Sequence, residues 1–343
     1  MKKIIALILI AVMMLSTMVA CASVGDVYAL EFSELSDGTY SVKVKANEKL
    51  VNLKKISIPA KYNGKDVTEI SDDAFNGAKN LKTVTIPDTV KKIGASAFEG
   101  CAALESVTIP DSVVSLGRNA FAYCAALKSV TIGEGVELIN DYTFASCILL
   151  DKITIGSRVK SIGEGAFGDC DSLVDITLPN SVTKIGAFAF SGCDKLVNIS
   201  IPNSVVYIGE EAFEKCNNID FTEYNNGKYL GNSGNSYVVL MGVMDNSIDS
   251  FSILNSTNVI YDGAFKNCNN IKSIVIPDNI MHIGGGAFSD CDNLISAKFD
   301  VTSGWKMIDP MSLDIIVVPQ EIFYDPIIAV EVLPLSYSYL TRS

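Results

Sequence analysis

The most constraining feature of this sequence is a phenylalanine that returns every 23 residues. Cysteine follows it three residues later in pentapeptides such as AFEGC at 97–101, AFAYC at 120–124 and AFSGC at 189–193. Internal periods of 20–50 residues indicate a solenoid or a related array, because one such unit cannot bury its apolar face and stacked units can. The column contains Phe75, Phe98, Phe121, Phe144, Phe167, Phe190 and Phe213, and resumes with Phe265 and Phe288.

One unit, LKTVTIPDTVKKIGASAFEGCAA at 81–103, shows how a turn is expected to form. Val84 and Ile86 are two residues apart, so they lie on one face of a strand, which Pro87 ends because proline cannot donate to a ladder. A second short extended piece, a corner at Gly94 with positive φ, and a tight helical turn holding the AF and C positions should follow. We therefore predict a β-rich solenoid of about nine coils with a parallel sheet, capped at both ends, with the phenylalanine column as its structural core.

Eight cysteines follow the same period, and their spacing constrains their chemistry. With one cysteine per coil, neighbours lie ~4.8 Å apart on one line, and their parallel Cβ vectors fit the torsion of a disulfide poorly. No C-x-x-C pair suggests zinc, and the only histidine, His282, is expected at a surface or cap position. We expect buried, reduced thiols, with disulfides or a metal site as alternatives, at Cys101, Cys124, Cys147, Cys170, Cys193, Cys216, Cys268 and Cys291.

The N-terminal residues 1–29 are typical of an export segment. Two lysines precede an apolar run over 4–15, which is short for a membrane span of about 20 residues. MVAC, ending at Cys21, resembles a lipobox and makes that cysteine a candidate for lipidation, whereas VYA at 27–29 would release a chain that begins at Leu30. An uncleaved anchor is a further alternative. We expect an exported protein, lipid-anchored at the bacterial cell surface or secreted, that touches the membrane only through such a lipid or anchor.

Three stretches leave the 23-residue period. Residues 30–53 contain LEFSELSDGTYSVKVKA, which predicts a hairpin that caps the first coil of a solenoid spanning 54–293. Residues 294–343 are expected to form a C-terminal cap or tail. At about 217–257 the sequence predicts an inserted hairpin. The alternative is a ligand loop, since insertions in repeat proteins often project from one face, with contacts from Tyr224, Tyr229 and Tyr237.

A column of hydroxyl side chains defines a candidate ligand face. The residue between the two inward-facing positions of each first strand must point outward. Threonine suits an exposed sheet surface for its β propensity alone, so the column has a purely structural interpretation. The alternative is a flat, neutral, hydrogen-bonding face for a glycoprotein or polysaccharide, formed by Thr85, Thr108, Thr131, Thr154, Thr177 and Ser200.

Composition and motifs argue against several other functions. The chain has 27 basic and 39 acidic residues, a net charge of −12, and lacks the clustered Lys and Arg that nucleic acid binding needs. We find no nucleophile–base pair, no phosphate-binding loop and no twelve-residue calcium loop. We therefore expect no enzyme, cofactor or metal. A divergent hydrolase would need convergent acids or a nucleophile–base pair.

The combined pattern LxxVxIPxxVxxIGxxAFxxC resembles the leucine-rich repeat of BspA-like bacterial surface proteins. Unlike commoner leucine-rich repeats, these units lack a regular Asn after the strand and carry Thr89, Ser112, Ser181 and Ser204 in that neighbourhood. The resemblance implies a non-enzymatic binding protein, an adhesin, because members of this family are associated with adhesion to host proteins such as fibronectin and fibrinogen and with co-aggregation. The expected partner is an extracellular protein or glycoprotein. A carbohydrate-binding accessory protein and a structural envelope component are the alternatives.

Overall fold

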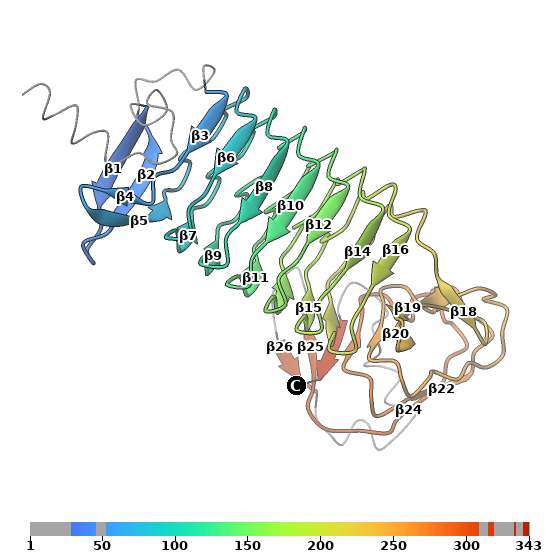
Figure 1. The fold of residues 1–343 in the computed structure, drawn as a ribbon. Helices are drawn as coiled ribbons and strands as arrows, with labels where there is room; N and C mark the ends of the chain where they lie inside the picture. The colour runs from blue at the N-terminus through green and yellow to red at the C-terminus, as the bar shows by residue number, and fades with distance from the viewer. Residues whose placement is uncertain (1–28, 46–52, 309–314, 319–332, 334–338, 343) are drawn as a thin grey trace, which may run out of the picture. The chain divides into compact units, whose positions relative to one another are not determined.

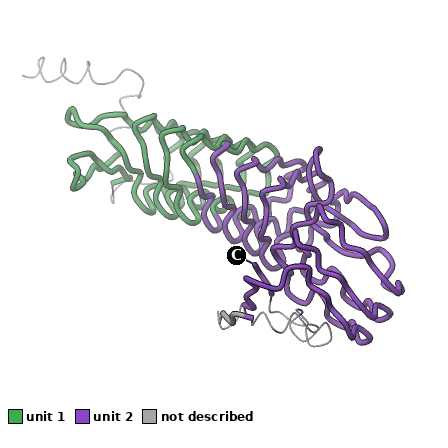
Figure 2. The backbone as a smooth tube through the Cα atoms, turned by 90° about the horizontal axis from the view of Figure 1, so that it is seen from below, with its two compact units in different colours: residues 1–136, 143–156 green, residues 137–142, 157–343 purple. Residues whose placement is uncertain are grey.

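The computed structural model describes residues 29–45, 53–308, 315–318, 333 and 339–342, and the chain divides into two compact units (Figure 2). Unit 1 runs to Val136 and includes 143–156, and unit 2 contains 137–142 and the rest. The predicted export segment, Cys21 included, lies outside the described residues apart from Ala29. The described residues contain no helix, and therefore none that is long and apolar enough to cross a membrane.

Unit 1 is built on two sheets of short strands (Figure 1). The first has the order β1-β2-β5-β7-β9, with β4 paired to β5, and the second has the order β12-β10-β8-β6-β3. The β1–β2 and β4–β5 pairs are antiparallel, and the other pairs in unit 1 are parallel. The strands are β1 (Leu30–Glu34), β2 (Tyr40–Val44), β3 (Lys55–Ser57), β4 (Lys61–Tyr62), β5 (Lys65–Ile70), β6 (Thr83–Thr85), β7 (Lys92–Ile93), β8 (Ser106–Ile109), β9 (Ser115–Leu116), β10 (Ser129–Ile132) and β12 (Lys152–Thr154).

Unit 2 continues the same design and adds antiparallel strands. Its sheets have the orders β11-β13-β15-β17, β14-β16, β22-β24 and β18-β19-β20-β21-β23-β27-β25-β26. The strands are β11 (Leu138–Ile139), β13 (Ser161–Ile162), β14 (Asp175–Thr177), β15 (Lys184–Ile185), β16 (Asn198–Ser200), β17 (Tyr207–Ile208), β18 (Thr222–Tyr224), β19 (Gly227–Asn232), β20 (Asn235–Val243), β21 (Val259–Ile260), β22 (Ser273–Ile276), β23 (His282–Ile283), β24 (Ser296–Phe299), β25 (Trp305–Ile308), β26 (Ile315–Val317) and β27 (Tyr339–Arg342).

Each regular turn contains a longer strand and a shorter one, and the chain between them differs from the prediction in one respect. Where the sequence predicts a helical turn around Ala97, Phe98 and Cys101, the backbone makes two successive tight turns. Ser96 has φ 52° and Gly100 has φ 67°, so a left-handed residue stands on either side of the phenylalanine. Such residues cannot continue a right-handed helix, and the phenylalanine points inward without one.

The glycine of the corner position is required for a different reason from the predicted one. Gly94 and Gly117 do not have positive φ. A Cβ built on Gly117 would lie 2.4 Å from the backbone nitrogen of Ala95 in the preceding turn. The glycines therefore permit close stacking of neighbouring turns, and the prediction of a left-handed corner at this position is wrong.

The apolar columns form the core of each unit. All nine phenylalanines of the repeat are buried. In unit 1 the rings of Phe75 and Phe98 stack with centroids 5.0 Å apart, and those of Phe98 and Phe121 with centroids 5.1 Å apart. Each buried ring stabilises the fold by roughly 1.5–3 kcal/mol relative to an exposed one.

Hydroxyl groups bridge the turns at the positions where commoner repeats carry asparagine. Ser112 Oγ donates to the carbonyl oxygen of Val90 at 2.7 Å, and Thr89 Oγ1 donates to that of Val67 at 2.8 Å. Ser181 and Ser204 make the corresponding bonds in unit 2. Each bond joins residues 22 apart in sequence, so it satisfies a carbonyl of the preceding turn.

The prediction of a β-solenoid is confirmed, with about 11 turns rather than about nine. The number of repeat phenylalanines is lower than the number of turns because some turns lack that residue. In the region 217–257, β18, β19 and β20 pair antiparallel, yet β20 also pairs parallel with β21. The amide of Ile201 donates to the carbonyl oxygen of Gly231 at 2.8 Å. The inserted segment thus takes part in the stacking as well as forming a hairpin.

Candidate functional site

The predicted hydroxyl column forms a straight ladder within each unit. In unit 1, Thr131 of β10 is in register with Thr108 of β8 and Thr154 of β12, and all three side chains are exposed. Thr85 is exposed at the same position of β6. In unit 2, Thr177 is in register with Ser200. The structure therefore brings four threonines together on one face of unit 1 and two hydroxyls together in unit 2.

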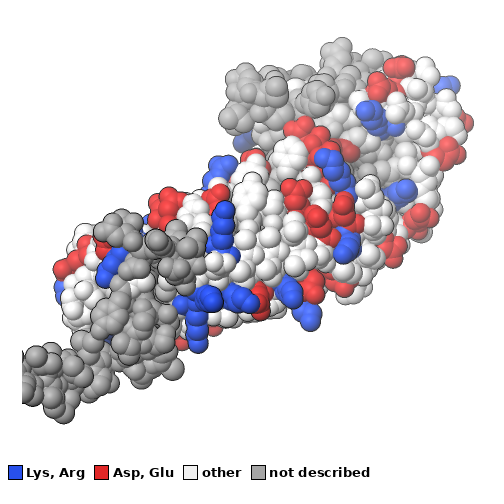
Figure 3. All heavy atoms as spheres, turned by 90° about the horizontal axis from the view of Figure 1, so that it is seen from above, with Lys and Arg blue, Asp and Glu red and all other residues white. Residues whose placement is uncertain are grey.

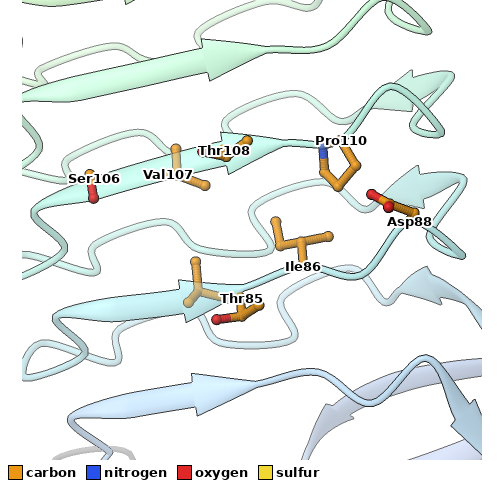
Figure 4. A pocket seen from close by; sticks show the side chains of 8 residues that line it. Thr85, Ile86, Asp88, Ser106, Val107, Thr108 and Pro110 are labelled. Atoms are coloured by element: carbon orange, nitrogen blue, oxygen red, sulfur yellow. The ribbon is translucent and has the colours of Figure 1, made fainter. Parts of the chain in front are cut away.

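A hollow of about 290 Å³ lies on this ladder in unit 1. Figure 4 shows that its side chains come from two neighbouring strands, β6 and β8, and the loops that follow them. Thr85, Ser106 and Thr108 supply hydroxyl groups, and Asp88 supplies a carboxylate. The lining can hydrogen-bond a neutral polar group, and it contains no basic side chain.

A larger hollow, of about 600 Å³, lies on the other sheet, in unit 2. It spans β11, β13, β15 and β17, and its lining mixes charged, aromatic and apolar side chains. Leu138 is 44% exposed within it. The residues that matter for its chemistry are Glu137, Leu138, Asp141, Lys160, Glu164, Lys184 and Tyr207.

Opposite charges are arranged within and beside this larger hollow. Glu137 pairs with Lys160 at 2.8 Å and with Arg158 at 3.0 Å, and these two bonds hold the pKa of its carboxyl below the usual value. The Lys184 ammonium lies 4.9 Å from the centroid of the Tyr207 ring. The lining therefore offers both signs of charge and an aromatic surface, a combination suited to recognising protein side chains.

The two exposed faces differ in how much they vary between turns. On the longer strands from β6 to β16 the outward column is threonine in five turns and serine in a sixth, and Val275 and Lys298 hold the position on β22 and β24. On the shorter strands the outward column changes in charge and size at almost every turn, through Lys92, Ser115, Leu138, Ser161, Lys184 and Tyr207. Sequence reasoning missed this second column. Alignment of the repeats on the isoleucine or leucine that follows each of these positions would have found it.

The predicted tyrosine contacts of the insertion do not form one exposed group. Tyr224 is 45% exposed, Tyr237 is half-buried and Tyr229 is fully buried. The Tyr229 ring packs edge-on against Tyr237 with centroids 5.3 Å apart, and burial raises its pKa to about 12. The prediction of Tyr229 as a ligand contact is wrong because the hairpin places it inside. Tyr224 and Tyr237, whose centroids are 5.4 Å apart, retain exposed surface.

The eight repeat cysteines are free and buried. Several of these thiols bridge the turns: Cys124 Sγ donates to the carbonyl of Phe98 at 3.3 Å, and Cys147 Sγ donates to that of Phe121 at 3.2 Å. Burial raises the pKa of the Cys101 thiol to about 12. Thiolates are the nucleophiles and metal ligands of cysteine chemistry, so the raised pKa keeps Cys101 a neutral core group. Within the described ranges, no three His, Cys, Asp or Glu side chains are grouped to hold a metal ion.

The position of His282 corrects another prediction. The side chain is only 1% exposed, where the sequence analysis expected a surface or cap position. It lies on β23, with the rings of Tyr207 and Tyr339 at centroid distances of 4.7 Å and 5.3 Å. The outward-facing position of this strand is covered by residues that are distant in sequence, which the repeat pattern does not reveal.

Surface charge on both units is mixed. Figure 3 shows Lys and Arg interspersed with Asp and Glu on the face that it presents. Many of the charged side chains form exposed ion pairs, such as Lys82 with Glu105 and Lys61 with Asp66. Exposed pairs of this kind add little stability.

Comparison with known proteins identifies the repeat. A family model described as the BspA-type leucine-rich repeat region matches the chain in six copies, over residues 40–170, 137–234 and 243–314. A search of curated proteins found no match.

Several solved structures are similar to this chain. A leucine-rich repeat protein from Bacteroides ovatus is 27% identical, with a TM-score of 0.45, over 80% of this chain and 70% of that one. A leucine-rich cell surface protein from Faecalibacterium prausnitzii is 26% identical, with a TM-score of 0.38, over 80% and 93% of the two chains. The leucine-rich repeat protein of T. pallidum is 20% identical, with a TM-score of 0.39, over 78% and 88%.

Proposed function

Because the chain belongs to the BspA-type leucine-rich repeat family, we propose that it is a non-enzymatic binding protein of the bacterial surface that holds an extracellular protein or glycoprotein, as an adhesin does. The export segment at 1–29 supports a location outside the cell, either lipid-anchored through Cys21 or secreted. Repeats of this family typically bind rather than catalyse.

The observation that carries the proposal is the outward column of the shorter strands in unit 2. The scaffold beneath it is uniform from turn to turn, while the exposed positions differ in charge, size and polarity. Protein recognition uses such a surface, since the pattern of charged, aromatic and apolar groups determines which partner fits. The larger hollow, between Glu137 and Tyr207, is the part of this surface that combines charged, aromatic and apolar side chains.

Binding of the processed chain, from Leu30, to immobilised fibronectin and fibrinogen at physiological salt tests the proposal. Leu138→Asp places a charge on the lining of the hollow, and Val114→Asp places the same charge at an exposed apolar position in unit 1. Both residues are substantially exposed, at 44% and 64%, so neither change should unfold the protein. We expect binding to fall at least about tenfold, or ~1.4 kcal/mol, for Leu138→Asp alone. Equal binding by both variants would contradict this location of the site.

A carbohydrate-binding role is the second candidate, and the hollow on the threonine ladder favours it. Its three hydroxyls and one carboxylate are groups that can hydrogen-bond a sugar. A glycan array with wild type and a Thr85→Val/Thr108→Val double variant distinguishes the two roles. Glycan binding that the double variant loses would support a carbohydrate ligand. Binding to neither the proteins nor the glycans would favour a structural envelope component.

A further inference from the structure

Backbone hydrogen bonds join the regular turns of unit 2 that precede residue 213. The amide of Gly186 donates to the carbonyl of Ile162, and that of Gly209 donates to Ile185, both at 2.8 Å. The amide of Phe190 donates to the carbonyl of Ala212 at 2.8 Å. Each turn thus satisfies the exposed edge of the turn before it, which is how stacked repeats extend a sheet.

At the turn formed by residues 203–213 this pattern changes, and side chains replace the missing backbone groups. Tyr261 Oη accepts the amide of Phe213 at 3.1 Å, and Asp262 Oδ2 accepts the amide of Glu211 at 3.0 Å. Asn258 Nδ2 donates to the carbonyls of Asn203 and Val205 at 2.8 and 3.1 Å. We call these side-chain contacts, together with the one made by His282, the closure.

His282 satisfies the carbonyl of Ile208. In the preceding turns the equivalent carbonyl, of Ile162 or Ile185, accepts a glycine amide of the next turn. The strand β17, which contains Ile208, is the last of its sheet. The imidazole therefore takes the place of a backbone N–H at an edge that would otherwise hold a buried, unpaired acceptor.

The second ring nitrogen of His282 makes no hydrogen bond to a described residue. Its Nδ1 is buried and has no hydrogen-bond partner among the described residues, so Nε2 carries the proton donated to Ile208. From β17 the ring faces Tyr207, and from β27 it faces Tyr339, and these two phenols hydrogen-bond each other. From β21, Val259 pairs with it, and from β27, Thr341.

The charged groups of this region lie around Tyr207 rather than His282. Asp262 and Glu210 act on the Tyr207 phenol, and the Lys184 ammonium lies over its ring. Burial and the Ile208 carbonyl are the two influences on the imidazole. A second ring proton would therefore place a charge and an unpaired N–H in a buried, uncompensated position, which is costly.

We propose that the closure is an acid-sensitive latch, in which protonation of His282 releases the C-terminal strand β27 and uncovers the edge strand β17. The strands β23 and β27 are antiparallel neighbours, with Thr341 opposite His282 and Leu340 opposite Ile283. The amide of Arg342 donates to the carbonyl of Met281 at 2.8 Å. The guanidinium of Arg342 lies over the indole ring of Trp305. Displacement of the imidazole would disturb this short strand first.

The direction of the response follows from the burial of the ring, which lowers the pKa of His282 to about 3. An exposed imidazole has a pKa of about 6.5. The open state therefore binds the proton more tightly, and the closed state loses stability as the pH falls below about 6.5. At pH 5 the histidine alone should favour opening by about 30-fold relative to pH 8.

Asp262 opposes this effect within the same closure. Burial raises the pKa of its carboxyl to about 6, although the amides of Glu211 and Gly285 donate to it. A carboxyl with a raised pKa destabilises the closed state above that pKa, and its protonation on acidification restores stability. At pH 5 the offset amounts to about tenfold, so the wild-type response should be smaller than that of the histidine alone.

Hydrogen exchange of the processed chain between pH 8 and pH 5, without a histidine tag and corrected for intrinsic rates, tests the latch. His282→Gln keeps a neutral N–H donor and cannot ionise. We expect the ratio of the wild-type opening equilibrium at β27 to that of His282→Gln to rise about 30-fold over this range. Asp262→Asn should steepen the wild-type response by about tenfold. Parallel pH profiles of wild type and His282→Gln would overturn the proposal.

A second measurement keeps the test decisive if His282→Gln does not fold. The chain has a single histidine, so its ring signals can be followed by NMR in the wild-type protein. We expect the ring of the folded protein to remain neutral at pH 5, and its protonation at lower pH to coincide with loss of protection in β27. A ring that titrates near its exposed value while β27 stays protected would overturn the proposal.

Discussion

The same solenoid is held together in two ways. Among the regular turns, backbone amides and carbonyls one turn apart pair directly, as Phe98 pairs with Ala120 and Gly117 with Ile93. At the closure, the side chains of Tyr261, Asp262 and His282 make the hydrogen bonds to the neighbouring turn instead. Stacking by backbone depends little on which side chains are present. Stacking by side chains depends on each of them and, for Asp262 and His282, on pH.

The core shows the same contrast. In the regular part of unit 2, Phe190 and Phe213 stack in parallel with centroids 5.6 Å apart. At the closure, Phe213 meets Tyr261 at a tilt of 53° and 5.9 Å. Cys216 Sγ still donates to the carbonyl of Phe190 at 3.0 Å. For Cys268, the first repeat cysteine after the closure, the structure shows no such bond to a described residue.

Loss of a stacked ring should give the largest effect. Phe121 lies between two parallel neighbours in unit 1, and Phe121→Ala should reduce the free energy of unfolding by about 3–5 kcal/mol, since it leaves a cavity in a packed column. Val114→Ala, at an exposed position, is the control and should change it by no more than about 0.5 kcal/mol. A denaturant melt in which both variants lose a similar small amount would show that the column does not support the fold.

Added volume between turns should come next. Gly117→Ala places a methyl group 2.4 Å from the backbone of Gly94 and Ala95, whereas the Cβ of Gly242→Ala would meet nothing nearer than 3.8 Å. We expect a loss of about 1–3 kcal/mol for Gly117→Ala, because backbone must move. Gly242→Ala should cost much less. Equal stability of the two variants in thermal melts would refute the close-stacking explanation of the corner glycines.

A loss of similar size is expected where a side chain replaces a backbone acceptor. Tyr261→Phe leaves the amide of Phe213 without its partner, and an unpaired buried amide costs about 1–3 kcal/mol. Tyr123→Phe removes a hydroxyl from a residue that is 58% exposed and should be almost neutral. If urea titration shows the same midpoint for both variants, the Tyr261 hydroxyl does not support the closure.

The cysteine bonds should give the smallest difference. Cys124→Ala removes a thiol that donates to a carbonyl of the preceding turn, whereas Cys268→Ala removes a buried thiol for which no such bond is seen. The first should cost about 0.5 kcal/mol more than the second, because S–H is a weak donor. A reversed order in paired denaturant melts would show that packing volume alone determines the value of these cysteines.

Much of the regular fold could be predicted from the sequence, because a period of 23 residues makes one turn a template for the others. The burial of Phe98 and Cys101 and the exposure of Thr85 follow from that template. The role of Gly94 could not be predicted, because it depends on the distance between residues that lie one turn apart. The environments of His282 and Tyr229 depend on irregular segments, where the template does not apply.

The candidate site shows the same limit. The threonine ladder was predictable because its residues repeat. The larger hollow was missed because its residues, such as Leu138 and Lys184, share a position in the repeat and nothing in their chemistry. A repeat pattern finds the scaffold and the uniform face, and a surface that differs at each turn has to be read from the structure.

Hydrogen exchange of individual amides at pH 7 tests the central contrast most directly. Phe190 and Phe213 occupy the same position in successive turns of unit 2, as do Phe188 and Glu211. The first of each pair donates to a backbone carbonyl, and the second donates to a side chain. We predict that Phe213 and Glu211 exchange faster than Phe190 and Phe188, through local opening of the closure. Equal protection within both pairs would contradict the account.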